Sequence, residues 1–152
     1  MTAILSNLQA IHSAIARAAQ LAQRNAAEIT LLAVSKTVSA EGVRAAYDAG
    51  QTAFGENYLQ EALDKMSALR DLAIEWHFIG PIQSNKTRAI AEHFSWVHSV
   101  DRLKIAERLS AQRPAHLPPL NVCLQVNVSG EDSKSGVAPQ DAAAVARAIA
   151  AL

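Results

Sequence analysis

The sequence predicts an α/β protein built on a parallel sheet of about five strands. Short apolar runs alternate along the chain with longer segments of helical character, which is the pattern of repeated β/α units. The first run, residues 29–35 (ITLLAVS), is continuously apolar, as is typical of a strand buried on both faces. Half of the 152 residues are hydrophobic and 18% are charged, which indicates a compact domain with its own core.

The N-terminal segment is predicted to be an amphipathic helix. Residues 1–27 contain Arg17 and Arg24 but no acidic residue, a composition also found in organellar transit peptides. A stripe of apolar side chains favours a helix that packs on a core instead, because its members recur at steps of three and four residues. The stripe consists of Ile4, Leu8, Ile11, Ile15, Ala18 and Leu21.

Five strands then alternate with helices, and turn-forming residues mark the limits of the helices. Ser39 is predicted to cap the second helix and Gly50 to end it. Asn57 and Asp101 are predicted to cap two later helices. A linker with three prolines separates the fifth helix from the last strand. The predicted strands are residues 29–35, 52–55, 74–79, 95–98 and 120–128.

Two parallel architectures fit this order of elements. A doubly wound sheet commonly carries a glycine-rich phosphate turn after its first strand, whereas this sequence has Ser35-Lys36-Thr37 there. A β/α barrel needs no such turn and carries its functional residues at the carboxyl ends of the strands, which is where Lys36, Asn57 and His77 occur. The barrel is therefore favoured. Because closure takes about eight strands, residues 1–152 are expected to form one partial barrel domain that ends before the barrel closes.

Charge and cysteine content exclude several classes of function. The 14 basic and 14 acidic residues balance, and no basic run supplies a footprint for nucleic acid. No apolar run approaches the roughly 18 residues of a membrane span. The five histidines lack the spacing of a metal site. The one cysteine, Cys123, cannot form an internal disulfide, so a soluble protein of the reducing cytoplasm is expected.

Four segments, in order and in register, resemble a known family. Lysine after a strand can form a Schiff base with an aldehyde, although a lysine in this position is more often merely solvated. The surrounding residues change that interpretation, because together they resemble the pyridoxal 5'-phosphate (PLP) homeostasis proteins, which are related in fold to the N-terminal domain of alanine racemase. The segments are AVSKT (33–37), FGENY (54–58), WHFIGPIQSNK (76–86), and NVS (127–129) with SKSG (133–136).

The resemblance implies a partial barrel of the alanine racemase N-terminal type, with PLP held as a Schiff base on Lys36. It also implies that Asn57 and Ile79 lie beside the cofactor ring. The residues themselves leave alternatives open, because Asn57 could serve only as a helix cap, and either Ile79 or Phe78 could face the barrel interior. Glu56 could act as a base or be a surface carboxylate. The segment that binds the phosphate in the family, and its Arg-x-Gly motif, would follow residue 152.

Three hypotheses about function remain at this stage. The first is a PLP-binding protein that holds or delivers the cofactor, with little turnover and no assigned catalytic residue. The second is a PLP-dependent racemase, which needs a second acid–base group besides the lysine. That group is usually a tyrosine, and the sequence contains only Tyr47 and Tyr58. The third is an inactive fragment. Since a partial barrel leaves sheet edges unpaired, self-association through those edges is also expected.

Overall fold

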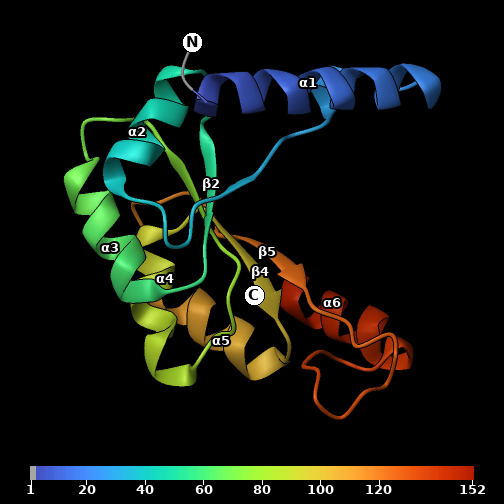
Figure 1. The fold of residues 1–152 in the computed structure, drawn as a ribbon. Helices are drawn as coiled ribbons and strands as arrows, with labels where there is room; N and C mark the ends of the chain where they lie inside the picture. Colours follow the sequence, from blue (N-terminus) through green and yellow to red (C-terminus); the bar gives the residue numbers. More distant parts are fainter. Residues whose placement is uncertain (1–2) are drawn as a thin grey trace.

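The computed structural model describes residues 3–152, which form one parallel sheet with helices packed against it (Figure 1). The strands are β1 (Ala33–Val34), β2 (Ala53–Glu56), β3 (Glu75–Phe78), β4 (Trp96–Val100) and β5 (Asn121–Leu124). The α-helices are α1 (Ala3–Leu21), α2 (Ala40–Asp48), α3 (Leu59–Ala68), α4 (Thr87–His93), α5 (Leu103–Gln112) and α6 (Ala142–Ala150). Short 3-10 helices occur at η1 (Ala26–Glu28), η2 (Ser84–Lys86) and η3 (Pro139–Asp141).

The order of strands in the sheet distinguishes the two architectures. The order is β1-β2-β3-β4-β5 and each pair is parallel, so every strand lies beside its neighbours in sequence. A doubly wound sheet reverses direction at a switch point, and this order contains no reversal. Successive right-handed crossovers in one direction put their helices on one face of the sheet, as in a β/α barrel. The prediction of a five-strand barrel segment is confirmed.

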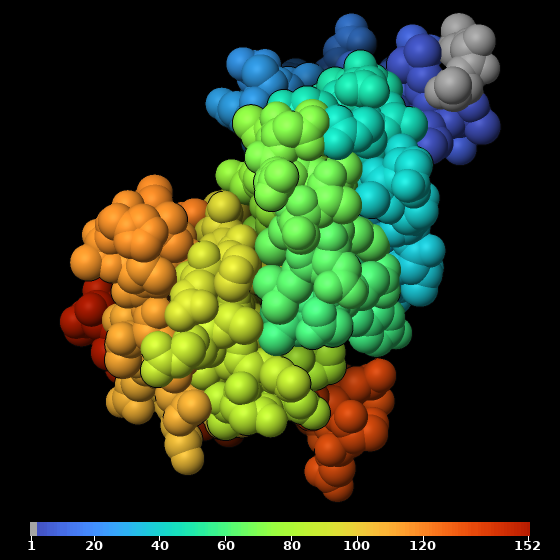
Figure 2. Space-filling model, turned by 90° about the vertical axis from the view of Figure 1, so that its left-hand side faces the viewer, coloured from blue at the N-terminus to red at the C-terminus, as the bar shows by residue number. Residues whose placement is uncertain are grey.

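The core lies between the sheet and its helical layer. Figure 2 shows this layer from outside, running from α2 and α3 through α4 to α5, in chain colours from cyan-green to orange. Phe54, Trp76 and Phe78 from the strands pack with fully buried helical residues such as Ile90 and Ile105. Phe78 meets the ring of Phe94 edge to face, with 5.3 Å between centroids. This apolar layer fixes which side chains face the helices and which face the opposite side of the sheet.

Local signals in the sequence located some element boundaries correctly and missed others. Ser39 caps α2 as predicted, because its hydroxyl oxygen accepts from the Gly42 N–H at 3.2 Å. Gly50 ends that helix with φ +98°, a backbone conformation that glycine adopts readily. The predicted cap at Asp101 is wrong, since Arg102 holds the N-cap position and Asp101 pairs with its guanidinium at 2.8 Å.

The first strand is shorter than its apolar run. Only Ala33–Val34 pairs with β2, and the carbonyl of Leu31 accepts from the side-chain amide of Gln51 at 2.7 Å instead of from a strand. Gln51 is buried and also donates to the Ala53 carbonyl. The Gln51 side chain therefore supplies hydrogen bonds to backbone carbonyls that would otherwise need a partner on a neighbouring strand.

Helix α1 runs along one end of the molecule and extends past α2 in Figure 1. The predicted apolar stripe is confirmed in part: Leu8 is buried and Ile4 and Ile15 are half-buried, whereas Ile11 and Leu21 are exposed by 45% and 87%. Among residues 3–152, no helix combines the length and the apolar character needed to cross a membrane. Residues 1 and 2, the start of the acid-poor segment, lie outside the described residues.

Candidate functional site

The register of the strands assigns each residue near the strand ends to one face of the sheet. Phe54 lies opposite Trp76 and Glu56 opposite Phe78, and three of these four side chains belong to the core under the helices. Gly55, which lies between them and opposite His77, therefore faces the other side. The same alternation puts Asn57 and Ile79, one residue past each strand, on that second face with Gly55.

Ile79, and not Phe78, turns away from the helices. Phe78 is 3% exposed and lies in the core cluster. A Cβ built on Gly55 would stand 3.1 Å from Cδ1 of Ile79, so the isoleucine side chain covers this glycine on the second face. The open choice between the two residues is thereby settled in favour of Ile79 on the face that forms a barrel interior.

Asn57 lies against the strand that follows it and is not a helix cap. The backbone of Gly80 approaches so closely that a Cβ there would stand 2.5 Å from the Asn57 carbonyl oxygen. Helix α3 begins at Leu59, with Tyr58 in the N-cap position and no side-chain cap. The predicted capping role of Asn57 is therefore wrong. Its Oδ1 is buried and has no hydrogen-bond partner within the described part of the chain.

Lys36 sits in a tight turn directly after β1. The hydrogen-bond ladder between β1 and β2 continues through Ser35, whose N–H donates to the Gly55 carbonyl at 2.9 Å. Continued by two residues, the register of these strands puts Lys36 beside Asn57. The Val38 N–H donates to the Ser35 carbonyl at 3.0 Å, which closes a four-residue turn with Lys36 second and Thr37 third. Lys36 is exposed.

The three predicted cofactor residues therefore leave the sheet at the same end. Lys36, Asn57 and Ile79 follow β1, β2 and β3, and the carboxyl ends of parallel strands meet at one edge of the sheet. A hollow of about 390 Å³ adjoins this edge, where Ile79 and Ser99 face the loop that carries Lys134. The roles of the three residues toward a cofactor stay predictions.

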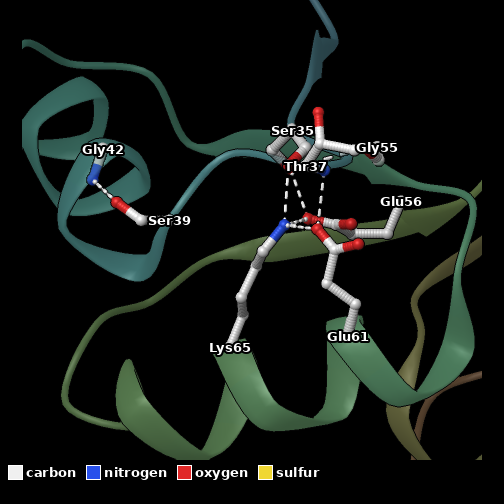
Figure 3. Close-up of polar contacts among 8 residues, drawn as sticks. All are labelled: Ser35, Thr37, Ser39, Gly42, Gly55, Glu56, Glu61 and Lys65. Carbon is white, nitrogen blue, oxygen red and sulfur yellow. Dashed lines mark hydrogen bonds and ion pairs between the residues drawn. The ribbon is translucent and has the colours of Figure 1, made fainter.

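A buried ionic cluster lies on the helical side of the same strand ends (Figure 3). Lys65 of α3 donates from Nζ to Glu56 Oε1 at 2.8 Å, to Glu61 Oε1 at 2.6 Å and to the Ser35 carbonyl at 2.6 Å. The Ser35 hydroxyl also donates to Glu56 Oε1, at 2.7 Å. The hydrogen bond from Lys65 is the main cause that lowers the pKa of Glu61.

This cluster corrects the interpretation of Glu56 as a surface carboxylate or a free base. Glu56 is 0% exposed and ion-paired with Lys65, whose own side chain is 7% exposed. One signal could have revealed the arrangement: Glu56 follows Phe54 by two residues and so shares its core-facing side of the strand. Glu61 and Lys65 are a second signal, because residues four apart on a helix lie on the same face and can form an ion pair.

A second polar group lies on the face opposite the helices, between β3 and β4. His77 Nδ1 and His98 Nε2 are 2.9 Å apart, and Glu75 Oε1 lies 2.9 Å from His77 Nε2. The Trp96 ring stacks on His77 with centroids 5.6 Å apart. The pKa of His98 is lowered mainly by burial and to a lesser extent by the neighbouring His77. No group of three or more potential metal ligands occurs in the described range 3–152.

Comparison with known proteins assigns the chain to a family. The family model described as "Alanine racemase, N-terminal domain" matches residues 6–152. The pyridoxal phosphate homeostasis protein of Pseudomonas aeruginosa is 66% identical over 149 residues, 98% of this chain and 65% of that protein. The protein of the same name from Vibrio alginolyticus is 52% identical and is covered to 67%. The chain belongs to the pyridoxal phosphate homeostasis proteins of the alanine racemase N-terminal domain family.

Solved structures of this family share the fold. PipY of Synechococcus elongatus with PLP bound superposes with a TM-score of 0.72 at 40% identity, over 88% of this chain and 62% of PipY. Alanine racemase from Corynebacterium glutamicum gives a TM-score of 0.53 at 25% identity, over 80% of this chain and 35% of the racemase. The chain thus spans about two thirds of the length of the relatives that it matches, for example 65% of the Pseudomonas protein.

Proposed function

We propose that this chain binds PLP as a Schiff base on Lys36 and serves in PLP homeostasis by holding the cofactor for other proteins. The observation that carries the proposal is the position of Lys36, which is exposed in a turn after β1 at the strand-end edge shared with Asn57 and Ile79. Support comes from relatives named for PLP homeostasis and from the PipY structure that contains PLP.

The residues at this edge fit an aldehyde cofactor. The Lys36 amine forms no ion pair or hydrogen bond within residues 3–152, so it is free to condense with an aldehyde, a reaction that forms one C=N bond and releases one water. The Asn57 amide is not used to cap α3, and its buried Oδ1 lacks a partner in the described chain. Ile79 supplies an apolar side chain for the ring to contact. PLP itself, when bound, supplies an electron sink.

Holding the cofactor is favoured over racemisation. Proton transfer on both faces of an amino acid requires a second acid–base group besides the lysine. Tyr47 lies in α2, which belongs to the helical layer on the far side of the sheet from Ile79, and Tyr58 is 56% exposed at the start of α3. Interconversion of L- and D-alanine by this chain, lost in Lys36→Ala, would overturn this preference.

Borohydride trapping is the direct test of the cofactor site. PLP is added, the C=N bond is reduced, and the labelled peptide is mapped by mass spectrometry. We expect the label on Lys36 and its complete loss in Lys36→Ala, because no other amine occupies that turn. Lys104→Ala, which removes an exposed lysine of α5, serves as the matched control and should label as the parent does.

The same labelling is carried out on this chain extended with the C-terminal third of the Pseudomonas protein. Labelling of Lys36 in the extended chain alone supports the site and assigns most of the affinity to the added segment. Equal labelling of the parent and Lys36→Ala in both forms overturns the proposal.

A cytoplasmic location and self-association belong to the same proposal. The single Cys123 is compatible with a reducing compartment. Strands β1 and β5 are the edges of the sheet, each with unpaired backbone groups on its outer side. We expect light scattering to give a mass above 16.2 kDa that rises with concentration. The extended chain should associate less, and a 16.2 kDa species at every concentration would contradict pairing through these edges.

A further inference from the structure

Both peptide groups that flank Lys36 are held by charged side chains of α3. On one side, Nζ of Lys65 donates to the Ser35 carbonyl at 2.6 Å. On the other, Oε1 of Glu61 accepts from the Thr37 N–H at 2.6 Å. Figure 3 shows the two side chains rising from one helix toward the turn. Hydrogen bonds to an ionised partner are shorter and about twice as strong as neutral ones.

These two contacts restrict the backbone of Lys36 itself. The Ser35 carbonyl belongs to the peptide plane before Lys36 and the Thr37 N–H to the plane after it. A residue has only two soft backbone torsions, and they relate these two planes. Fixing both planes therefore fixes the direction in which the Lys36 side chain leaves the turn.

The turn also contains a strained residue that needs support. Thr37 has φ +64°, in the left-handed region that a β-branched residue seldom adopts. Such strain persists only where surrounding structure holds it. The bond to Glu61 holds the peptide plane before Thr37, and the bond from the Val38 N–H to the Ser35 carbonyl holds the plane after it.

The Lys65 ammonium behind the turn uses all of its donors, so it holds the turn from three directions. An ammonium group has three N–H donors, and Lys65 uses three, toward Ser35, Glu56 and Glu61. Glu56 Oε1 additionally accepts from the Ser35 hydroxyl. The arrangement ties β1, β2 and α3 to the turn from the side of the sheet opposite Ile79.

We propose that Glu61 and Lys65 are positioning residues, which fix the turn that presents the Lys36 amine to an aldehyde cofactor. This inference rests on the proposed function, since it assigns a purpose to the orientation of Lys36. It adds two residues from the helical layer that would not touch the cofactor.

Glu61→Ala is the variant of choice, because the Glu61 side chain is 31% exposed and its loss leaves the Glu56–Lys65 pair intact. Asp64→Ala is the matched control, because it removes an acid from the same helix that accepts from the Gln60 amide and not from the turn. Glu61→Gln tests rescue, because its amide oxygen can still accept from the Thr37 N–H. Two quantities are measured on each: the rate of PLP labelling at Lys36, and amide hydrogen exchange at Thr37.

In Glu61→Ala we expect exchange at Thr37 to rise and labelling at Lys36 to slow, each by about tenfold, as for loss of one charge-assisted hydrogen bond. Glu61→Gln should recover most of both, and Asp64→Ala should change neither. Unchanged exchange overturns the inference, as does unchanged labelling with faster exchange. If neither the parent chain nor its extended form takes label on Lys36 while exchange at Thr37 rises as expected, the support of the turn stands and the proposed function fails.

Discussion

Replacing Lys65 with methionine is expected to lower the free energy of unfolding by about 3–5 kcal/mol, the range for breaking a buried ion pair from one side. Glu56 is 0% exposed, and in the variant its carboxylate keeps only the Ser35 hydroxyl as a partner. Methionine matches the length of the lysine stem, so no cavity is created, and the loss comes from the unpaired Glu56 carboxylate together with the lost bonds to Ser35 and Glu61. Urea unfolding followed by circular dichroism measures the change.

The charge explanation is tested by a second variant and a control. Glu56→Gln combined with Lys65→Met removes both buried charges and should recover most of the stability, because a neutral pair no longer leaves a carboxylate without a counter-ion. Lys104→Met replaces an exposed lysine and should stay within about 0.5 kcal/mol of the parent. A double variant as unstable as Lys65→Met alone would show that packing, not charge, is responsible.

Gly80→Ala is expected to cost about 1–3 kcal/mol and to weaken PLP binding. The added Cβ would stand 2.5 Å from the Asn57 carbonyl oxygen and 3.0 Å from its Cα, and backbone atoms cannot rotate aside. The strand ends of β2 and β3 must therefore separate, which moves Asn57 relative to Ile79. Urea unfolding and a PLP titration followed by absorbance measure the two effects.

Gly42→Ala provides the matched control for this substitution. The nearest neighbour of the added Cβ is a side-chain atom, Cγ1 of Val38 at 2.8 Å, which can rotate away. Alanine is also favoured over glycine within a helix such as α2. We expect a small effect on stability and none on PLP affinity. A loss in Gly42→Ala equal to that in Gly80→Ala would show that close approach to Asn57 is not the cause.

The sequence predicted the order of elements well because alternating apolar runs and turn residues are local signals. Ser39 and Gly50, for example, act within one turn of a helix, and both took their predicted roles. The apolar run at 29–35 was misjudged because apolar character reports burial and not strand pairing. Gln51, about twenty residues away, supplies the hydrogen bond that replaces the ladder there.

The candidate site was predicted less completely than the fold. The family resemblance selected Lys36, Asn57 and Ile79, the predicted strand limits put them at the ends of three strands, and the register then separated Ile79 from Phe78. Glu56 was misplaced because a carboxylate at a strand end usually faces water. Only the fold shows that a lysine from α3 meets it beneath the turn.

The strand order also bears on how the chain assembles as it is made. Each strand pairs with its neighbour in sequence, as with Ala33 and Phe54 or Val97 and Val122, so each new unit docks on one already completed. The connections between strands that are neighbours in sequence are short, so closing them costs little conformational entropy. Lys36, Asn57 and Ile79 all belong to the first three units. During synthesis from the N-terminus, these three residues can therefore take their places in the sheet before β4 and β5 emerge from the ribosome.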